Sequence, residues 1–144
     1  MTATWRHDDG GKTAAGIRGA TGDCVCRAIA IVTGRPYSEI YALLETAAQR
    51  ERRTKRRKTR SHPKKGVYRV TYERVLADLC FRFVPTLTIG SGCRVHLRAE
   101  ELPPGKIIAR LSRHLCAVID GVIHDTHDPT RAGTRCVYGY FTRD

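Results

Sequence analysis

The first half of the chain carries apolar residues at the spacing of helices. Four of them lie at positions i, i+3, i+4 and i+7, namely Val25, Ala28, Ile29 and Val32. This spacing predicts a helix over residues 23–33 with one buried face. Asp23 precedes the helix as a predicted N-cap, whose carboxylate would accept a hydrogen bond from a backbone N–H of the first turn. Similar spacing predicts two more helices, over residues 38–50 and 71–79.

The second half of the chain carries short β-prone segments separated by proline, glycine or aspartate. These segments predict strands over residues 81–84, 87–89, 94–97, 107–111, 114–119, 122–126 and 136–141. Helices followed by strands indicate an α+β fold, with N-terminal helices packed on a C-terminal antiparallel β-sheet. With 144 residues, 41% of them hydrophobic, the chain predicts one domain over residues 21–144 after an irregular lead-in over residues 1–20.

Asp120-Gly121 predicts the register of one hairpin in this sheet. Asp-Gly is a favoured two-residue type I′ loop, so Ile119 should pair with Val122, and Cys116 with Asp125. Side chains alternate between the two faces of a strand. One face therefore collects four residues at the end far from the turn, namely His114, Cys116, Asp125 and His127. At a strand end, we expect the Asp125 carboxylate to contribute little to packing.

Cys24 opens the first predicted helix, where its chemistry differs from that of an ordinary cysteine. The helix N-terminus carries partial positive charge, which favours a thiolate, and a nearby imidazolium favours it further. His114, with Asp125 diagonally opposite, would supply that imidazole as the general base of a Cys-His-Asp triad. Cys26 is the alternative nucleophile, but it lies about 200° around the helix from Cys24. Only one of the two can face His114, and Cys24 is preferred.

The order of these residues resembles that of papain-like cysteine peptidases. The stretches Gly22-Asp23-Cys24 and His114 to Asp125 are similar to those of small papain-fold proteins of phages and bacteria, which are related in pattern to bacteriocin-processing peptidases. The resemblance covers residues 17–142. It implies Cys24 as nucleophile, His114 as base and Asp125 as the residue that orients the base. The implied activity is hydrolysis of a peptide or isopeptide bond, or acyl transfer, on a protein or peptide substrate and without a cofactor.

The chain departs from the papain-like pattern at the oxyanion site. Papain-like enzymes usually carry a glutamine a few residues before the cysteine, whereas the only glutamine here is Gln49 and the chain contains no asparagine. The backbone N–H of Cys24 can serve as one oxyanion donor, and Arg18 or Thr21 is the candidate for the second. Loss of one donor lowers the rate by about 10²–10³-fold. A catalytically silent papain-fold protein that binds nucleic acid or a protein partner is therefore the alternative function.

Positive charge is concentrated in one segment of the chain. Residues 50–65 hold ten lysines and arginines against one glutamate, and so carry +9 of the total charge of +12. This basic insertion is either a solvated loop or a surface that binds nucleic-acid phosphates or an acidic partner. The residues predicted to make that contact are Arg52, Arg53, Lys55, Arg56, Arg57, Lys58 and Arg60. Because the segment has almost no apolar residues, we expect its deletion to leave the domain folded.

The six cysteines have no secretory context in the sequence. The N-terminal segment lacks the apolar centre of a signal peptide, and no segment is apolar enough to span a membrane. We therefore expect a cytoplasmic protein with reduced cysteines and no membrane partner. No CxxC pair is present, and we expect no metal. The alternative use of the polar strand face is a zinc site formed by His114, Cys116, Asp125 and His127.

Overall fold

The computed structural model describes residues 4–18, 22–56, 59–88 and 90–143, which form the α+β fold that the sequence predicts. The described helices are α1 (Cys24–Thr33), α2 (Tyr37–Gln49), α3 (Arg69–Asp78) and the short 3₁₀ helix η1 (Ala99–Glu101). Within the described residues, six strands form one sheet in the order β1-β5-β4-β3-β6-β2. Their bounds are β1 (Thr4–His7), β2 (Arg82–Pro85), β3 (Lys106–Leu111), β4 (His114–Ile119), β5 (Val122–Asp125) and β6 (Gly139–Thr142).

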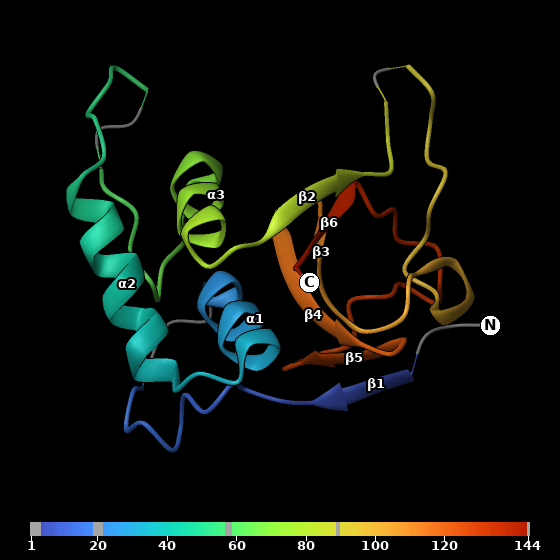
Figure 1. Cartoon of the computed structure of the whole chain (residues 1–144), viewed down its shortest axis with the longest axis horizontal. Helices are drawn as coiled ribbons and strands as arrows, with labels where there is room; N and C mark the ends of the chain where they lie inside the picture. Colours follow the sequence, from blue (N-terminus) through green and yellow to red (C-terminus); the bar gives the residue numbers. More distant parts are fainter. Residues whose placement is uncertain (1–3, 19–21, 57–58, 89, 144) are drawn as a thin grey trace.

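The three α-helices lie together on one side of the curved sheet, with α1 between α2 and the strands (Figure 1). The apolar face of α1 packs against β4, and together with α2 and α3 it forms the larger of two apolar clusters. The second cluster contains Ile107, Val118 and Ile123, against which Leu97 and Val137 pack. Because neighbouring strand residues point to opposite faces, the two clusters lie on the two sides of the sheet. None of the described helices is long and apolar enough to cross a bilayer.

The sheet is mixed, which corrects the prediction of an antiparallel sheet. Strand β1 lies at the edge and runs parallel to β5, pairing Thr4 with Val122 and His7 with Asp125. The expectation of an irregular lead-in is therefore wrong for Thr4–His7. The Trp5 indole N–H also donates to the carbonyl oxygen of Asp125 at 3.2 Å, and the Asp8 backbone N–H donates to the same oxygen at 2.9 Å. The N-terminal segment thus fixes the backbone of a candidate site residue.

The hairpin between β4 and β5 has the predicted register. Ile119 pairs with Val122, as the Asp-Gly loop requires. Asp120 and Gly121 have φ angles of 49° and 79°, and two positive φ angles are what a type I′ turn needs. The Asp120 carboxylate accepts a hydrogen bond from the Gly105 N–H at 2.7 Å, which joins the turn to the loop before β3.

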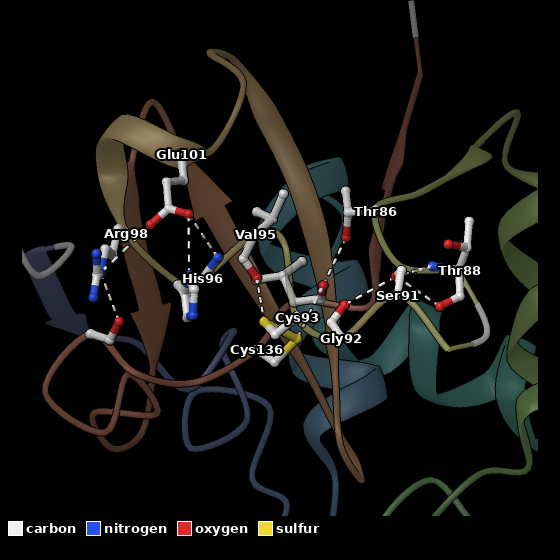
Figure 2. Close-up of a disulfide and its surroundings, with 12 residues drawn as sticks. Thr86, Thr88, Ser91, Gly92, Cys93, Val95, His96, Arg98, Glu101 and Cys136 are labelled. Atoms are coloured by element: carbon white, nitrogen blue, oxygen red, sulfur yellow. Dashed lines mark hydrogen bonds and ion pairs between the residues drawn. A yellow bond between two sulfur atoms is a disulfide. The ribbon is translucent and has the colours of Figure 1, made fainter.

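Residues 86–88 and 90–98 lie in loops, where the sequence predicted two short strands, and the second of these segments is cross-linked to the segment before β6. Cys93 and Cys136 form a disulfide with a Cα–Cα distance of 5.8 Å (Figure 2), which is within the usual range for a disulfide. The expectation of reduced cysteines is therefore wrong for these two residues. His96 makes an isolated bridge with Cys136, which is all that remains of the strand predicted over residues 94–97. Of the strand predicted over residues 87–89, Ile89 lies outside the described residues.

Candidate active site

Cys24 is the first residue of α1, and its surroundings are set by the two residues before it. A Cβ atom on Gly22 would lie 2.7 Å from the carbonyl oxygen of Lys65, so only glycine allows the chain to pass this closely. Asp23 occupies the N-cap position, as predicted, but its carboxylate makes no capping hydrogen bond. The predicted cap bond is wrong because this side chain is turned towards other partners. Cys24 itself is half-buried and lines a cleft of about 500 Å³.

His114 and Asp125 meet where β4 begins and β5 ends. The His114 Nε2 atom lies 2.5 Å from Asp125 Oδ2. Asp125 is 2% exposed, and its other oxygen accepts the Thr126 backbone N–H at 2.7 Å. The expectation that this carboxylate contributes little to packing is therefore wrong. Since Asp125 engages Nε2, the Nδ1 atom of the ring is the one left for the Cys24 thiol, which lines the same cleft as His114.

The three side chains shift one another's protonation. Burial favours the neutral Cys24 thiol, but the hydrogen bond and the charge of His114 outweigh it and lower the pKa of Cys24. Burial also opposes the charged imidazole, yet the bonds to Asp125 and Cys24 raise the pKa of His114 to about 9. The same contact with His114 lowers the pKa of Asp125 in spite of its burial. The arrangement therefore shifts the pair towards a thiolate beside an imidazolium.

Arg27 holds this site together and was given no role from the sequence. It lies on the first turn of α1 and is only 5% exposed, so its charge needs partners. Its guanidinium contacts the Asp125 carboxylate at 3.2 Å and also pairs with Asp23, four residues earlier on the same helix. Tyr37 donates its hydroxyl hydrogen to Asp23 at 2.8 Å. Asp23, at the N-cap, and Arg27 lie four residues apart on an otherwise apolar helix. This spacing is the sequence pattern that could have indicated a buried ion pair.

The predicted oxyanion residues are not brought together by the described structure. Arg18 is exposed, and its carbonyl oxygen accepts the ammonium hydrogen of Lys64 at 3.1 Å. Thr21 lies outside the described residues. The remaining donors next to the thiol are the backbone N–H groups at the start of α1, which the helix itself leaves unpaired. A helix N-terminus also favours negative charge, so these groups suit a developing oxyanion.

Of the other predicted residues, Cys26 and Cys116 lie in the apolar core, and His127 lies beside Asp125. Cys26 is fully buried with its sulfur 3.8 Å from the Tyr37 carbonyl oxygen, and burial raises its pKa to about 12. Cys116 is buried in the second apolar cluster. Donor atoms of His114, Asp125 and His127 do lie within 4.8 Å of one another. However, Arg27 already occupies one oxygen of Asp125, and a second cation there would be repelled. This arrangement fits a triad better than a metal site.

The basic insertion is only partly a free arm. Arg52, Arg53, Lys55 and Arg56 are exposed, and Arg57 and Lys58 lie outside the described residues. Arg60, by contrast, donates to the carbonyl oxygens of Ala48 and Gln49 at 3.0 and 2.7 Å. These carbonyls end α2, where a helix leaves its last acceptors unpaired. Arg60 therefore caps α2 through its Nη1 atom.

The end of the insertion is anchored by Glu51. Its carboxylate accepts hydrogen bonds from the Ser61 backbone N–H at 2.7 Å, from the Ser61 hydroxyl and from the Thr71 hydroxyl on α3. Ser61 and Thr71 are both buried. The segment thus makes polar contacts with the helices that its lack of apolar residues does not reveal, and these contacts argue against deleting the whole of residues 50–65.

Replacing only residues 52–58 with a short glycine-serine linker should leave the melting temperature within about 2 °C of wild type, because exposed substitutions change stability by about 0.5 kcal/mol or less. Glu51→Ala should lower it by about 5–10 °C, because buried donors lose a charged acceptor worth about 2–3 kcal/mol. Thermal unfolding followed by circular dichroism measures both. If the linker replacement lowered the melting temperature as much as Glu51→Ala does, the distinction between an exposed segment and an anchored end of the insertion would be wrong.

No family model, no curated protein and no solved structure matches this chain. What the site does must therefore follow from the chain's own side chains: a thiol with a lowered pKa, a buried His-Asp pair and an arginine that joins the helix to the sheet.

Proposed function

We propose that this protein is a thiol-dependent hydrolase that cleaves a peptide or isopeptide bond. In this proposal Cys24 is the nucleophile, His114 is the general base and acid, and Asp125 orients the imidazole. The observation that carries the proposal is that His114 lines the same cleft as Cys24 and that its Nε2 atom lies 2.5 Å from the buried Asp125 carboxylate. A helix-opening cysteine, a strand-opening histidine and an acid on the neighbouring strand also support the papain-like resemblance.

The proposed reaction has two steps. The Cys24 thiolate attacks the carbonyl carbon, and His114 gives its proton to the leaving nitrogen as the C–N bond breaks, so that a thioester remains. Water then gives a proton to His114 and attacks the thioester, and cleavage of the C–S bond releases the acid and the thiolate. An amine in place of water would give acyl transfer by the same route. Asp125 stays ionised throughout and stabilises the imidazolium.

An activated ester tests the proposal without knowledge of the natural substrate. With p-nitrophenyl acetate at pH 7, we expect a burst of p-nitrophenolate equal in amount to the protein, and an acetyl group on Cys24 in peptide mass spectra. Cys24→Ala should lack the burst, whereas Cys26→Ala should keep it. Acetylation of the exposed Cys80 in place of Cys24 would contradict the proposal.

The alternative is a catalytically silent protein that binds nucleic acid through the exposed part of the basic insertion. The observation in its favour is the exposure of Arg52, Arg53, Lys55 and Arg56. Such binding would be insensitive to sequence and would weaken steeply with salt. The glycine-serine replacement of residues 52–58 should then remove the affinity for single-stranded DNA while Cys24→Ala leaves it unchanged.

A further inference from the structure

The cleft at Cys24 continues into a second cavity. The second cavity has a volume of about 700 Å³, and it shares the lining residues Arg69, Arg110 and Tyr138 with the cleft. Its walls include Phe83 and the disulfide of Cys93 with Cys136, beside the loop that Figure 2 shows. A chain bound at the thiol can therefore extend past Arg110 into an apolar cavity.

Among the charged side chains that line the two cavities, basic residues occur and acidic residues do not. Lys65, Arg69, Arg110 and Arg113 line one or both, and no aspartate or glutamate of the described residues does. Arg69 is paired with Glu73 at 2.9 Å. Among the described residues, no carboxylate forms an ion pair with Lys65, Arg110 or Arg113. The cleft thus presents three cationic side chains that have no carboxylate partner among the described residues.

Arg110 is the best placed of these cations. It lies on β3 opposite Leu115, the neighbour of His114, and is half-buried where the two cavities meet. Its guanidinium lies 5.8 Å from the centre of the Phe83 ring, close enough for a cation–π contact that favours this position. Gly139 makes room for this ring, because a Cβ there would collide with it. A positioned guanidinium without a carboxylate is a binding group for one.

We propose that the substrate of Cys24 is an acidic peptide, with a glutamate or aspartate side chain bound by Arg110 and an apolar side chain in the second cavity. This inference rests on the proposed hydrolase function. The apolar walls formed by Phe83, Pro85 and Leu87 suit a hydrophobic side chain and do not suit a phosphodiester backbone, which favours a peptide over a nucleic acid. The positive cleft would also speed the approach of such a substrate at low salt.

Binding to the Cys24→Ala protein tests the proposal separately from catalysis. The probes are two fluorescein-labelled hexapeptide libraries, identical except that one carries glutamate and the other glutamine at a fixed position. Fluorescence anisotropy should give about 10- to 100-fold tighter binding of the glutamate library, as expected for a charge-assisted hydrogen bond. Arg110→Gln should remove this preference, and Arg110→Lys, which keeps the charge, should retain most of it. Arg74→Gln, on the exposed face of α3 and outside both cavities, is the matched control and should change nothing.

Equal affinity for the two libraries would overturn the acidic-peptide proposal. Tight binding of a single-stranded oligonucleotide that Arg110→Gln abolishes, without any peptide preference, would also overturn it and assign the cleft to nucleic acid. Both results are independent of the acylation experiment with p-nitrophenyl acetate. A protein that acylates at Cys24 but shows no glutamate preference would keep the hydrolase function and lose only this inference.

Discussion

Iodoacetamide at pH 6 is expected to alkylate Cys24 at least about tenfold faster than the other free cysteines, since each unit of lowered pKa raises the thiolate fraction tenfold. The reason is the hydrogen bond and charge of His114, which lower the pKa of Cys24. The other free cysteines are Cys26, Cys80 and Cys116, and burial raises the pKa of the first of them to about 12. Peptide mass spectrometry at short reaction times measures which thiol has reacted.

The controls separate the two cysteines of the first helix turn. Cys24→Ala should abolish the fast phase, and Cys26→Ala should leave it intact. If Cys26→Ala removes the fast phase, the assignment of the nucleophile is wrong. If no cysteine reacts quickly, the proposed hydrolase function loses its chemical basis.

The shifted pKa values of Cys24 and His114 determine how the reaction rates change with pH. Alkylation should rise as the pH passes upwards through the lowered pKa of Cys24, well before an ordinary thiol ionises. Acylation by a peptide substrate also needs the proton of His114, whose pKa is raised to about 9. Its rate should therefore fall as the pH rises through about 9, which gives a bell-shaped profile.

Asp125→Ala is expected to lower the free energy of unfolding by about 3 kcal/mol, because removing one member of a buried ion pair typically costs about 3–5 kcal/mol. The lower end applies because Asp23 remains on the Arg27 guanidinium. The melting temperature should fall by about 6–12 °C. Alkylation of Cys24 at pH 6 should also slow by about tenfold, as the imidazolium loses the carboxylate that stabilises it. Thermal unfolding and alkylation kinetics on the same preparation measure both effects.

Asp120→Asn is the matched control, at the turn of the same hairpin. Asn-Gly suits the same type I′ turn, and an amide oxygen can still accept the Gly105 N–H. This variant should keep both stability and reactivity. Among the described residues, Asp128 binds only Thr130 within its own turn, so Asp128→Ala should not change the alkylation rate. If Asp128→Ala slowed Cys24 and Asp125→Ala did not, the triad would have to be redrawn.

Features with a local sequence pattern could be predicted before the structure was known. Apolar spacing placed α1 at its observed bounds to within a residue. An α-helix has 3.6 residues per turn whatever it packs against, so its buried positions recur with that period in the sequence. Asp120-Gly121 determined the pairing of Ile119 with Val122, because the turn allows only one register. These two local results already directed attention to Cys24, His114 and Asp125.

Contacts between distant segments became visible only in the folded protein. The pairing of Thr4 with Val122 and the disulfide of Cys93 with Cys136 join positions that no short-range pattern connects. The same holds for Arg27, which sequence spacing links to Asp23 but not to Asp125, 98 residues away. A buried charge takes whichever acid the fold brings to it, because leaving it unpaired in the interior is too unfavourable. The burial of Asp125, and with it the support of the candidate site, is therefore a property of the folded chain.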